Sequence, residues 1–159
     1  METRSSLYVG KEHVALTLQL QGGTVLAGNV FLFPESGPGV FLWSRLLQFM
    51  NDPSPYFPFE AREGGIVLVT RRAVMRVTLG GAETNEEDPA IYFVSAARAR
   101  FLLTDGSSID GRVFIDSKPP NTRISDFLCK PEPFFHVVDE RGHEILNKES
   151  VPLVYPLPG

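Results

Sequence analysis

The stretch "FLLTDGSSIDGRVFI", residues 101–115, is matched by "LQLQGGTVLAGNVFL", residues 18–32, in the same order of apolar, turn and glycine positions. Identical residues pair as Leu20 with Leu103, Gly23 with Gly106, Gly28 with Gly111, Val30 with Val113 and Phe31 with Phe114. Average residue usage gives about one chance identity over a window of this length. The match therefore predicts that the chain is a tandem repeat of two copies.

The similarity extends to the end of each copy. The segment "PSPYFPF" (53–59) corresponds to "PEPFFHV" (131–137), and Gly64 corresponds to Gly142. The offset between the copies falls from 83 residues at the start to 78 at the end. We place the five extra residues of the first copy in the loop 33–41, whose Pro and Gly residues suit an irregular connection.

An acidic segment, "GGAETNEEDPA" at residues 80–90, lies between the two copies. It contains no Lys or Arg, and outside it the acidic residues equal the 15 Lys and Arg, although the whole chain has a net charge of −4. We expect a linker at 80–90 between repeats at 8–79 and 91–159. A chain that is neutral outside its linker is not expected to have a strong general attraction to phosphate backbones.

Both copies alternate apolar and other residues with the period of a β-strand that has one buried face. The inward positions are Val14, Leu16, Leu18 and Leu20 in the first copy and Ala97, Ala99, Phe101 and Leu103 in the second. Gly28 and Gly111 fall inside the second strand, where a missing side chain permits a bend. Pro152 and Pro156 indicate that the final strand is an edge, because proline cannot donate to a ladder. We expect five strands per copy, with a helical turn or short arm before the third.

Composition limits the class of protein. The 159 residues are 43% hydrophobic and 21% charged, which is typical of a soluble protein with a core. Without an export leader or a membrane-spanning run, we expect a cytoplasmic protein of bacterial type that has no membrane contact. The single cysteine, Cys129, excludes an internal disulfide and a cysteine-based zinc site, and we expect it to be a small buried side chain.

The stretch 101–115, followed by "NKESVPLVYPLP" at 147–158, resembles the Sm-like family and within it the bacterial Hfq group. Lys148 matches the lysine that precedes the closing strand of that group, while Glu149 stands where the group has histidine. The segment "RISDFL" (123–128), with its following "PFF", is also similar to bacterial domains of this size that have no settled activity. The resemblance implies a mostly β fold of two tandem five-stranded Sm- or SH3-like small barrels, packed as a pseudo-symmetric pair.

Candidate catalytic and metal-binding residues are few. His136, Asp139, His143 and Glu144 have the side-chain types of a metal site, but the corresponding turn of the first copy has no histidine. Cys129 and His136 are the one candidate pair for nucleophilic catalysis, and no Gly-x-Ser-x-Gly elbow or phosphate-binding Gly-rich loop is present. We therefore expect no enzyme activity, no cofactor and no metal.

The favoured hypothesis is a binding or scaffold module for protein partners, which include further copies of the chain. It would act by strand addition or through the connections 33–45 and 116–133. The candidate contact residues are Phe41, Trp43, Arg123 and Asp126. Two alternatives stay open: Trp43 can instead pack between the copies, and Arg123 with Asp126 can form a local ion pair.

The second hypothesis is RNA or DNA binding through outward arginines, with an affinity that falls steeply with salt. The candidate residues are Arg98, Arg100 and Arg112 in the second copy and Arg71, Arg72 and Arg76 in the first. A solvated strand face is the alternative account of these arginines. A small-molecule site in the cleft between the copies is a third hypothesis, for which no set of residues stands out.

Overall fold

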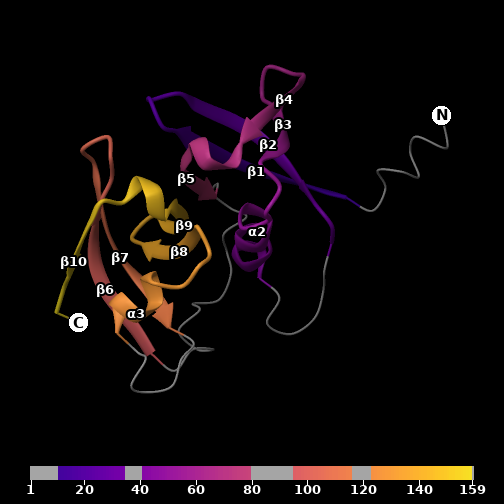
Figure 1. Cartoon of the computed structure of the whole chain (residues 1–159). Coiled ribbons are helices and arrows are strands. Elements are labelled where there is room, and N and C mark those ends of the chain that lie inside the picture. The colour runs from indigo at the N-terminus through magenta and orange to yellow at the C-terminus, as the bar shows by residue number, and fades with distance from the viewer. Residues whose placement is uncertain (1–10, 35–40, 80–94, 116–122, 159) are drawn as a thin grey trace.

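A computed structural model describes residues 11–34, 41–79, 95–115 and 123–158, and in it both alternating segments form β-hairpins (Figure 1). The first hairpin pairs β1 (Glu12–Leu20) with β2 (Val25–Leu32), and the second pairs β6 (Ser95–Leu102) with β7 (Ser108–Ile115). Gly22, Gly23 and Gly106 have positive φ at the turns, which glycine adopts without strain. The alternation therefore predicted these strands correctly.

The remaining elements follow in the same order in each half of the chain. The N-terminal half continues with α2 (Leu42–Met50), β3 (Tyr56–Ala61), β4 (Ile66–Thr70), a 3₁₀ turn (Arg71–Ala73) and β5 (Val74–Leu79). The C-terminal half continues with α3 (Ile124–Leu128), β8 (Phe134–Asp139), β9 (Gly142–Asn147), a 3₁₀ turn (Lys148–Ser150) and β10 (Leu153–Pro156). The expected linker 80–90 lies outside the described residues. No helix in the described ranges has the length and apolar character that crossing a bilayer requires.

All ten strands belong to one antiparallel sheet in the order β10-β6-β7-β8-β9-β5-β1-β2-β3-β4. The expectation of a mostly β protein is confirmed, but the sheet is open and does not form closed barrels. The reason is the pairing of β5, whose two neighbours are β1 and β9, so that β4 and β10 remain as the two ends of the sheet. The edge position expected for the final strand is therefore confirmed.

Gly28 and Gly111 lie where the second strand of each half meets the third. A Cβ on Gly28 would collide with the carbonyl oxygen of Glu60 in β3. A Cβ on Gly111 would lie 2.5 Å from Cγ1 of Val137 and 2.9 Å from the carbonyl oxygen of Val138 in β8. Both glycines are therefore required because a neighbouring backbone approaches closely.

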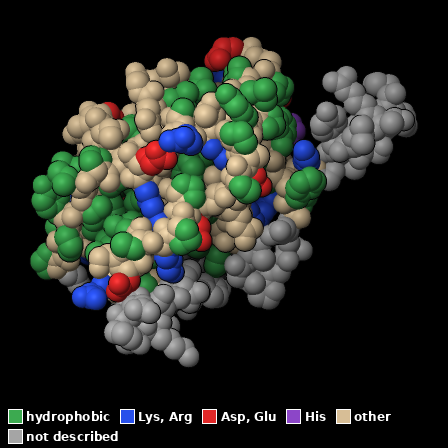
Figure 2. Space-filling view, in the orientation of Figure 1, with side chains coloured by type: hydrophobic (Ala, Val, Ile, Leu, Met, Phe, Trp, Pro, Cys, Tyr) green, Lys and Arg blue, Asp and Glu red, His purple; other side chains and the backbone are tan. Residues whose placement is uncertain are grey.

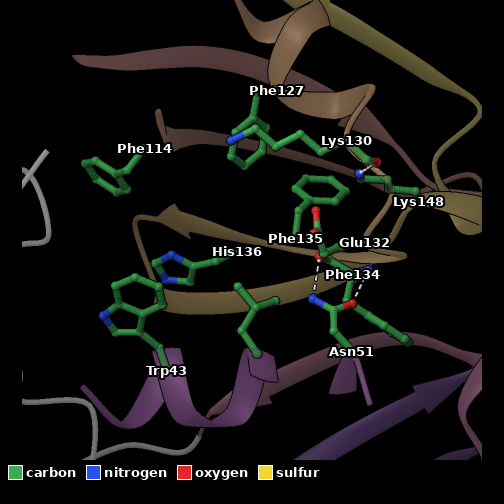
Figure 3. A pocket seen from close by; sticks show the side chains of 11 residues that line it. Trp43, Asn51, Phe114, Phe127, Lys130, Glu132, Phe134, Phe135, His136 and Lys148 are labelled. Atoms are coloured by element: carbon green, nitrogen blue, oxygen red, sulfur yellow. Dashed lines mark hydrogen bonds between the residues drawn. The ribbon is translucent and has the colours of Figure 1, made fainter. Parts of the chain in front are cut away.

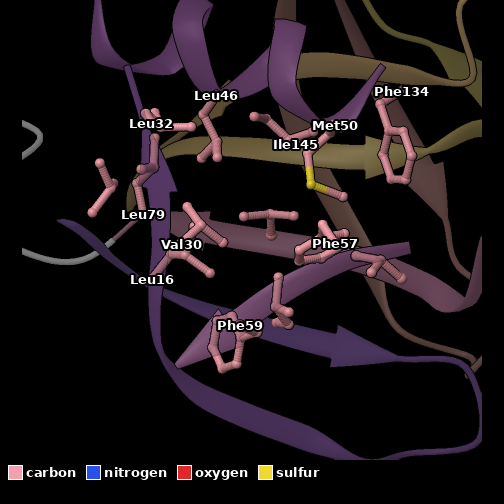
Figure 4. Close-up of a cluster of buried hydrophobic side chains, with 14 of the residues drawn as sticks. Leu16, Val30, Leu32, Leu46, Met50, Phe57, Phe59, Leu79, Phe134 and Ile145 are labelled. Carbon is pink, nitrogen blue, oxygen red and sulfur yellow. The ribbon is translucent and has the colours of Figure 1, made fainter. Parts of the chain in front are cut away.

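Two apolar cores lie on opposite faces of β8 and β9, where the two halves of the chain meet. Phe134 and Ile145, from the C-terminal half, pack in the N-terminal core with residues such as Met50 (Figure 4). Their sequence neighbours Phe135 and Leu146 pack in the C-terminal core. Successive residues of a strand point to opposite faces, so β8 and β9 contribute one face to each core. The two halves therefore share their cores, and α2 packs against β8 between them (Figure 1).

Candidate functional site

The junction between the halves is the β5–β9 strand pair, called here the seam. Its register places Val77 opposite Ile145 and Thr78 opposite Glu144. The Nε of Arg76 donates to Oε1 of Glu144 over 2.5 Å, and the hydroxyl of Thr78 donates to the same oxygen over 3.1 Å. Burial raises the pKa of the Glu144 carboxyl, although both donors oppose this shift. The seam therefore contains a buried charged contact, and Asn147 of β9 adds a hydrogen bond to the Val74 carbonyl of β5.

The outer edges of the sheet correspond to the two strands of the seam. At the 78-residue offset, β4 corresponds to β9 and β10 corresponds to β5. Both outer edges expose large apolar side chains, which Figure 2 shows as apolar areas at the two ends of the molecule. The exposed fractions are 56% for Ile66, 41% for Val67 and 69% for Leu68 on β4, and 50% for both Leu153 and Tyr155 on β10. The corresponding apolar residues of the seam are buried in the two cores: Val77 and Ile145 in one, Met75 and Leu146 in the other.

A cavity of about 240 Å³ lies between α2 of the N-terminal half and the α3, β7 and β8 elements of the C-terminal half (Figure 3). Most of its wall is aromatic: Trp43, Phe114, Phe127, Phe134, Phe135 and His136. The remaining residues of the wall are Leu47, Asn51, Lys130, Glu132 and Lys148. This pocket is the cleft between the copies for which the sequence singled out no residues.

Two contacts hold α2 against β8, one at each end of the pocket. The Asn51 side chain donates to the Phe134 carbonyl (3.2 Å) and accepts from the Phe134 N–H (2.8 Å). At the other end the rings of Trp43 and His136 stack with centroids 3.9 Å apart. The Nε2 of His136 lies 2.8 Å from Nδ1 of His143, and burial, with a smaller effect of His143, lowers the pKa of His136 to about 3. A neutral His136 therefore stacks on the tryptophan.

A second cavity, of about 390 Å³, is lined by the corresponding residues of the N-terminal half. Its wall includes Phe31, Phe49, Tyr56, Phe57 and Pro58, which correspond to Phe114, Phe127, Phe134, Phe135 and His136. Here the guanidinium of Arg71 lies 5.1 Å from the ring centroids of both Phe49 and Phe57. The N-terminal half thus places its own cation between the two rings.

The four candidate partner contacts form two local pairs. Phe41 is half-buried and stacks on Trp43 at 5.7 Å, and Trp43 is only 6% exposed. This burial favours the packing alternative for Trp43. The Nε of Arg123 lies 3.5 Å from Asp126 at an i,i+3 spacing, which is the local ion pair left open above.

The arginines of β6 and β7 lie on one face, where Arg98 is opposite Arg112. Arg98 donates to the carbonyl of Pro158 (3.1 Å), and Arg112 lies 5.3 Å above the Phe114 ring. Arg100 makes a two-point contact with Asp110, at 2.7 and 2.9 Å. One polar hollow is lined by four arginines, Arg76, Arg98, Arg112 and Arg141, and by three acidic residues, Asp110, Asp139 and Glu140. Acidic residues therefore accompany the cations on this face.

The arginines of the N-terminal half do not form the outward cluster that the sequence predicted. Arg71 is buried and donates to the carbonyls of Phe49, Ser54 and Tyr56, and burial lowers its pKa. Arg76 is directed to Glu144 at the seam. Arg72 is exposed and lies 3.5 Å from Glu149. The prediction was wrong because the 3₁₀ turn Arg71–Ala73 turns Arg71 inward, toward the carbonyl groups around the end of α2.

Cys129 is exposed beyond the end of α3, so the expectation of a buried side chain was wrong. The five-residue helix is too short to cover it. His136 and His143 meet as described, and within the described ranges no group of three or more His, Cys, Asp or Glu side chains is placed to hold a metal ion.

Comparisons with known proteins add no assignment: no family model, no curated protein and no solved structure matches this chain.

Proposed function

We propose that this chain is a non-enzymatic scaffold that binds further copies of itself, by pairing the β10 edge of one copy with the β4 edge of the next. The observation that carries the proposal is the seam, where the fourth strand of one half already pairs with the fifth strand of the other. The outer edges are the same two strands of the opposite halves. As part of this proposal the two halves are tandem repeats that resemble the Sm-like family, with their strands joined in one open sheet, within a cytoplasmic protein.

The seam specifies a register for the outer pairing. Applying the 78-residue offset to the Val77–Ile145 pair gives Tyr155 opposite Val67. The Arg76–Leu146 pair gives Val154 opposite Leu68 in the same way. The exposed apolar side chains of both edges would be removed from water by this pairing, which is the main driving force for such contacts.

The side chains of the two outer edges favour pairing of β10 with β4 over pairing of an outer edge with a strand of the seam. The positions of Arg76, Thr78 and Glu144 correspond to Val154, Pro156 and Ile66, so the outer pair buries no charge. If β10 replaced β5 beside β9, Glu144 would lose its donors and remain buried. A buried carboxylate without a partner is costly, so this wrong pairing is disfavoured.

Backbone groups limit the strength of the outer pairing. The Leu157 N–H donates to Arg98 on β6, so the alternate residues Val154 and Pro156 direct their backbone groups outward. Pro156 has no N–H, and the outer pair therefore makes fewer ladder bonds than the seam. We expect association that is reversible and depends on concentration.

The alternative of nucleic-acid binding has less support. Arg98 and Arg112 lie on one face, as that hypothesis requires, but the acids of the polar hollow accompany them. Arg71 and Arg76 are directed into the protein. A phosphate backbone would meet a face of mixed charge rather than a basic patch.

The test is the oligomeric state, measured by native mass spectrometry and light scattering over a range of concentrations. Val67→Glu and Tyr155→Lys each alter an exposed side chain, so each is expected to fold and to lose self-association. An equimolar mixture of the two variants is expected to associate again, because the unaltered β10 edge of the Val67→Glu copy can pair with the unaltered β4 edge of the Tyr155→Lys copy. Val25→Glu is the matched control, since Val25 is 60% exposed but lies on β2, away from both edges.

A wild-type chain that stays monomeric at every concentration would overturn the proposal. So would association that both edge substitutions leave unchanged. Extra mass that nuclease removes would instead support the nucleic-acid alternative, and Arg98 and Arg100 would be the first residues to substitute.

A further inference from the structure

We propose that the cavity between α2 and β8 binds a small aromatic carboxylate. This inference goes beyond the scaffold function, and it does not depend on it because the described residues of the wall belong to one chain. The volume of about 240 Å³ suits a single substituted aromatic ring, since an engineered apolar cavity of about 150 Å³ in another protein binds benzene.

The aromatic part of the ligand is specified by the wall. The rings of Phe127 and Phe135 are T-shaped with centroids 6.3 Å apart, and Phe114 and His136 stack at 6.4 Å. Figure 3 shows Phe114, Phe127, Phe135 and His136 arranged around the space. A planar ring in this space gains both edge and face contacts, which aromatic pairs prefer.

The charge of the ligand is inferred from the two lysines that line the pocket. The Lys148 ammonium donates to the carbonyl of Lys130 over 2.6 Å, and the Lys130 ammonium lies 5.7 Å from the centroid of the Phe127 ring. Among the described residues of the wall, Glu132 is the one carboxylate beside two lysines, which leaves an excess of one positive charge. Burial lowers the pKa of Lys148, so a bound anion would stabilise its charged form. A carboxylate is the anion that completes these contacts.

The pocket is held open by the protein rather than filled by it. The Asn51–Phe134 and Trp43–His136 contacts hold α2 and β8 together at the two ends of the pocket. In the N-terminal half the Arg71 guanidinium occupies the space beside the corresponding rings. The residue that corresponds to Arg71 is Glu149, which is directed outward to Arg72. The position that places a cation beside the rings in the N-terminal half therefore places none beside the rings of this pocket.

The sole tryptophan of the chain, Trp43, lines the pocket and provides a direct readout. We would titrate the wild-type chain with phenylacetate and follow Trp43 fluorescence. The uncharged 2-phenylethanol and the cationic phenethylamine have the same ring and similar size, so they isolate the effect of charge. We expect saturable quenching by phenylacetate and weaker binding of the other two.

Two substitutions in the wall of the pocket are expected to change the affinity for phenylacetate in opposite directions. Lys148→Met is expected to weaken phenylacetate binding roughly tenfold, because a charge-assisted hydrogen bond is lost. Glu132→Gln is expected to strengthen it, because a repelling carboxylate is removed. Arg141→Gln removes an exposed cation that lines a different hollow and is expected to leave binding unchanged. Far-ultraviolet circular dichroism checks that each variant is folded.

Two results would overturn the proposal. One is the absence of a saturable Trp43 response to phenylacetate in the folded wild-type chain. The other is tighter binding of phenethylamine, or equal binding of all three probes with no effect of Lys148→Met. Failure here would leave the self-association of the edges untouched, since neither β4 nor β10 lines the pocket.

Discussion

The guanidinium of Arg76 and the carboxylate of Glu144 are in contact across the seam, with Nε and Oε1 2.5 Å apart and Glu144 only 1% exposed. No other part of the β5–β9 contact carries a charge pair among the opposed residues Arg76–Leu146, Val77–Ile145 and Thr78–Glu144. The seam therefore differs from the outer edges, because it has a charged pair where the corresponding outer positions are apolar.

Arg76→Met is expected to destabilise the fold by about 3 kcal/mol, because Glu144 is then left buried without its charged donor. Urea unfolding measures the change. The control is Arg72→Gln, which breaks the exposed Arg72–Glu149 contact and is expected to cost less than about 1 kcal/mol. Equal effects of the two substitutions would mean that the seam pair contributes no more than a surface ion pair.

The stability of the fold is expected to fall on acidification through the titration of His136. Its folded-state pKa of about 3 lies below the ordinary value of 6.5, so the unfolded chain binds more protons between these values. The contribution of neutral His136 to the free energy of unfolding is therefore fully present above pH 6.5. It decreases toward pH 3, with a slope of at most about 1.4 kcal/mol per pH unit.

Urea midpoints across this pH range provide the measurement. His136→Gln is expected to flatten the profile, and His13→Gln, at a largely exposed ring, is expected to leave it unchanged. An identical slope in wild type and His136→Gln would show that other groups carry the acid sensitivity.

Local patterns in the sequence predicted the strands, because alternation reports which face of a strand is buried. Val14, Leu16 and Leu18 are buried as their period indicated, and the two prolines of the last segment placed it at an edge. Partner choice between distant strands is not a local property. The segment "EILNK" has no local pattern that identifies "VMRVTL" as its partner. Each of these strands has a charged residue, Glu144 or Arg76, and the opposite charges were a signal that the two strands could pair.

The pocket was hidden from the sequence for a related reason. Trp43, Phe134 and His136 each have an ordinary core interpretation, and four elements, α2, α3, β7 and β8, must converge before they enclose a space. Arg71 shows the same limit: its neighbours in the sequence suggested an outward cluster, but the carbonyl groups that it binds belong to residues 15 to 22 positions away.

The two strand-interior glycines are expected to be unequally sensitive. Gly28→Ala directs its Cβ at a backbone carbonyl that it would overlap and should cost about 3 kcal/mol or more. Gly111→Ala meets a Val137 methyl that can give way and the Val138 carbonyl oxygen at the longer distance of 2.9 Å, and it should cost about 1–3 kcal/mol. Gly23→Ala, in open space at a positive φ, should cost about 1–2 kcal/mol. Thermal unfolding of the three variants gives the order. A Gly28→Ala variant as stable as Gly23→Ala would mean that β2 and β3 can separate without loss.

Trp43 and Arg123 were both candidates for partner contact, and the structure predicts that their substitution by alanine has different effects on stability. Trp43→Ala removes the stack on His136 and one of the two contacts that hold α2 against β8, so it should cost about 3–5 kcal/mol. Arg123→Ala removes an exposed i,i+3 ion pair and should change stability by less than about 0.5 kcal/mol.

Denaturant unfolding of both variants, with the oligomeric state measured alongside, distinguishes the roles. Loss of stability in Trp43→Ala together with unchanged self-association of the folded fraction assigns Trp43 to the packing between the halves. A stable Trp43→Ala variant that no longer associates would assign it to a partner contact instead. Because Trp43 is 6% exposed whereas β4 and β10 expose apolar side chains at the two edges, the first result is the one that the structure predicts.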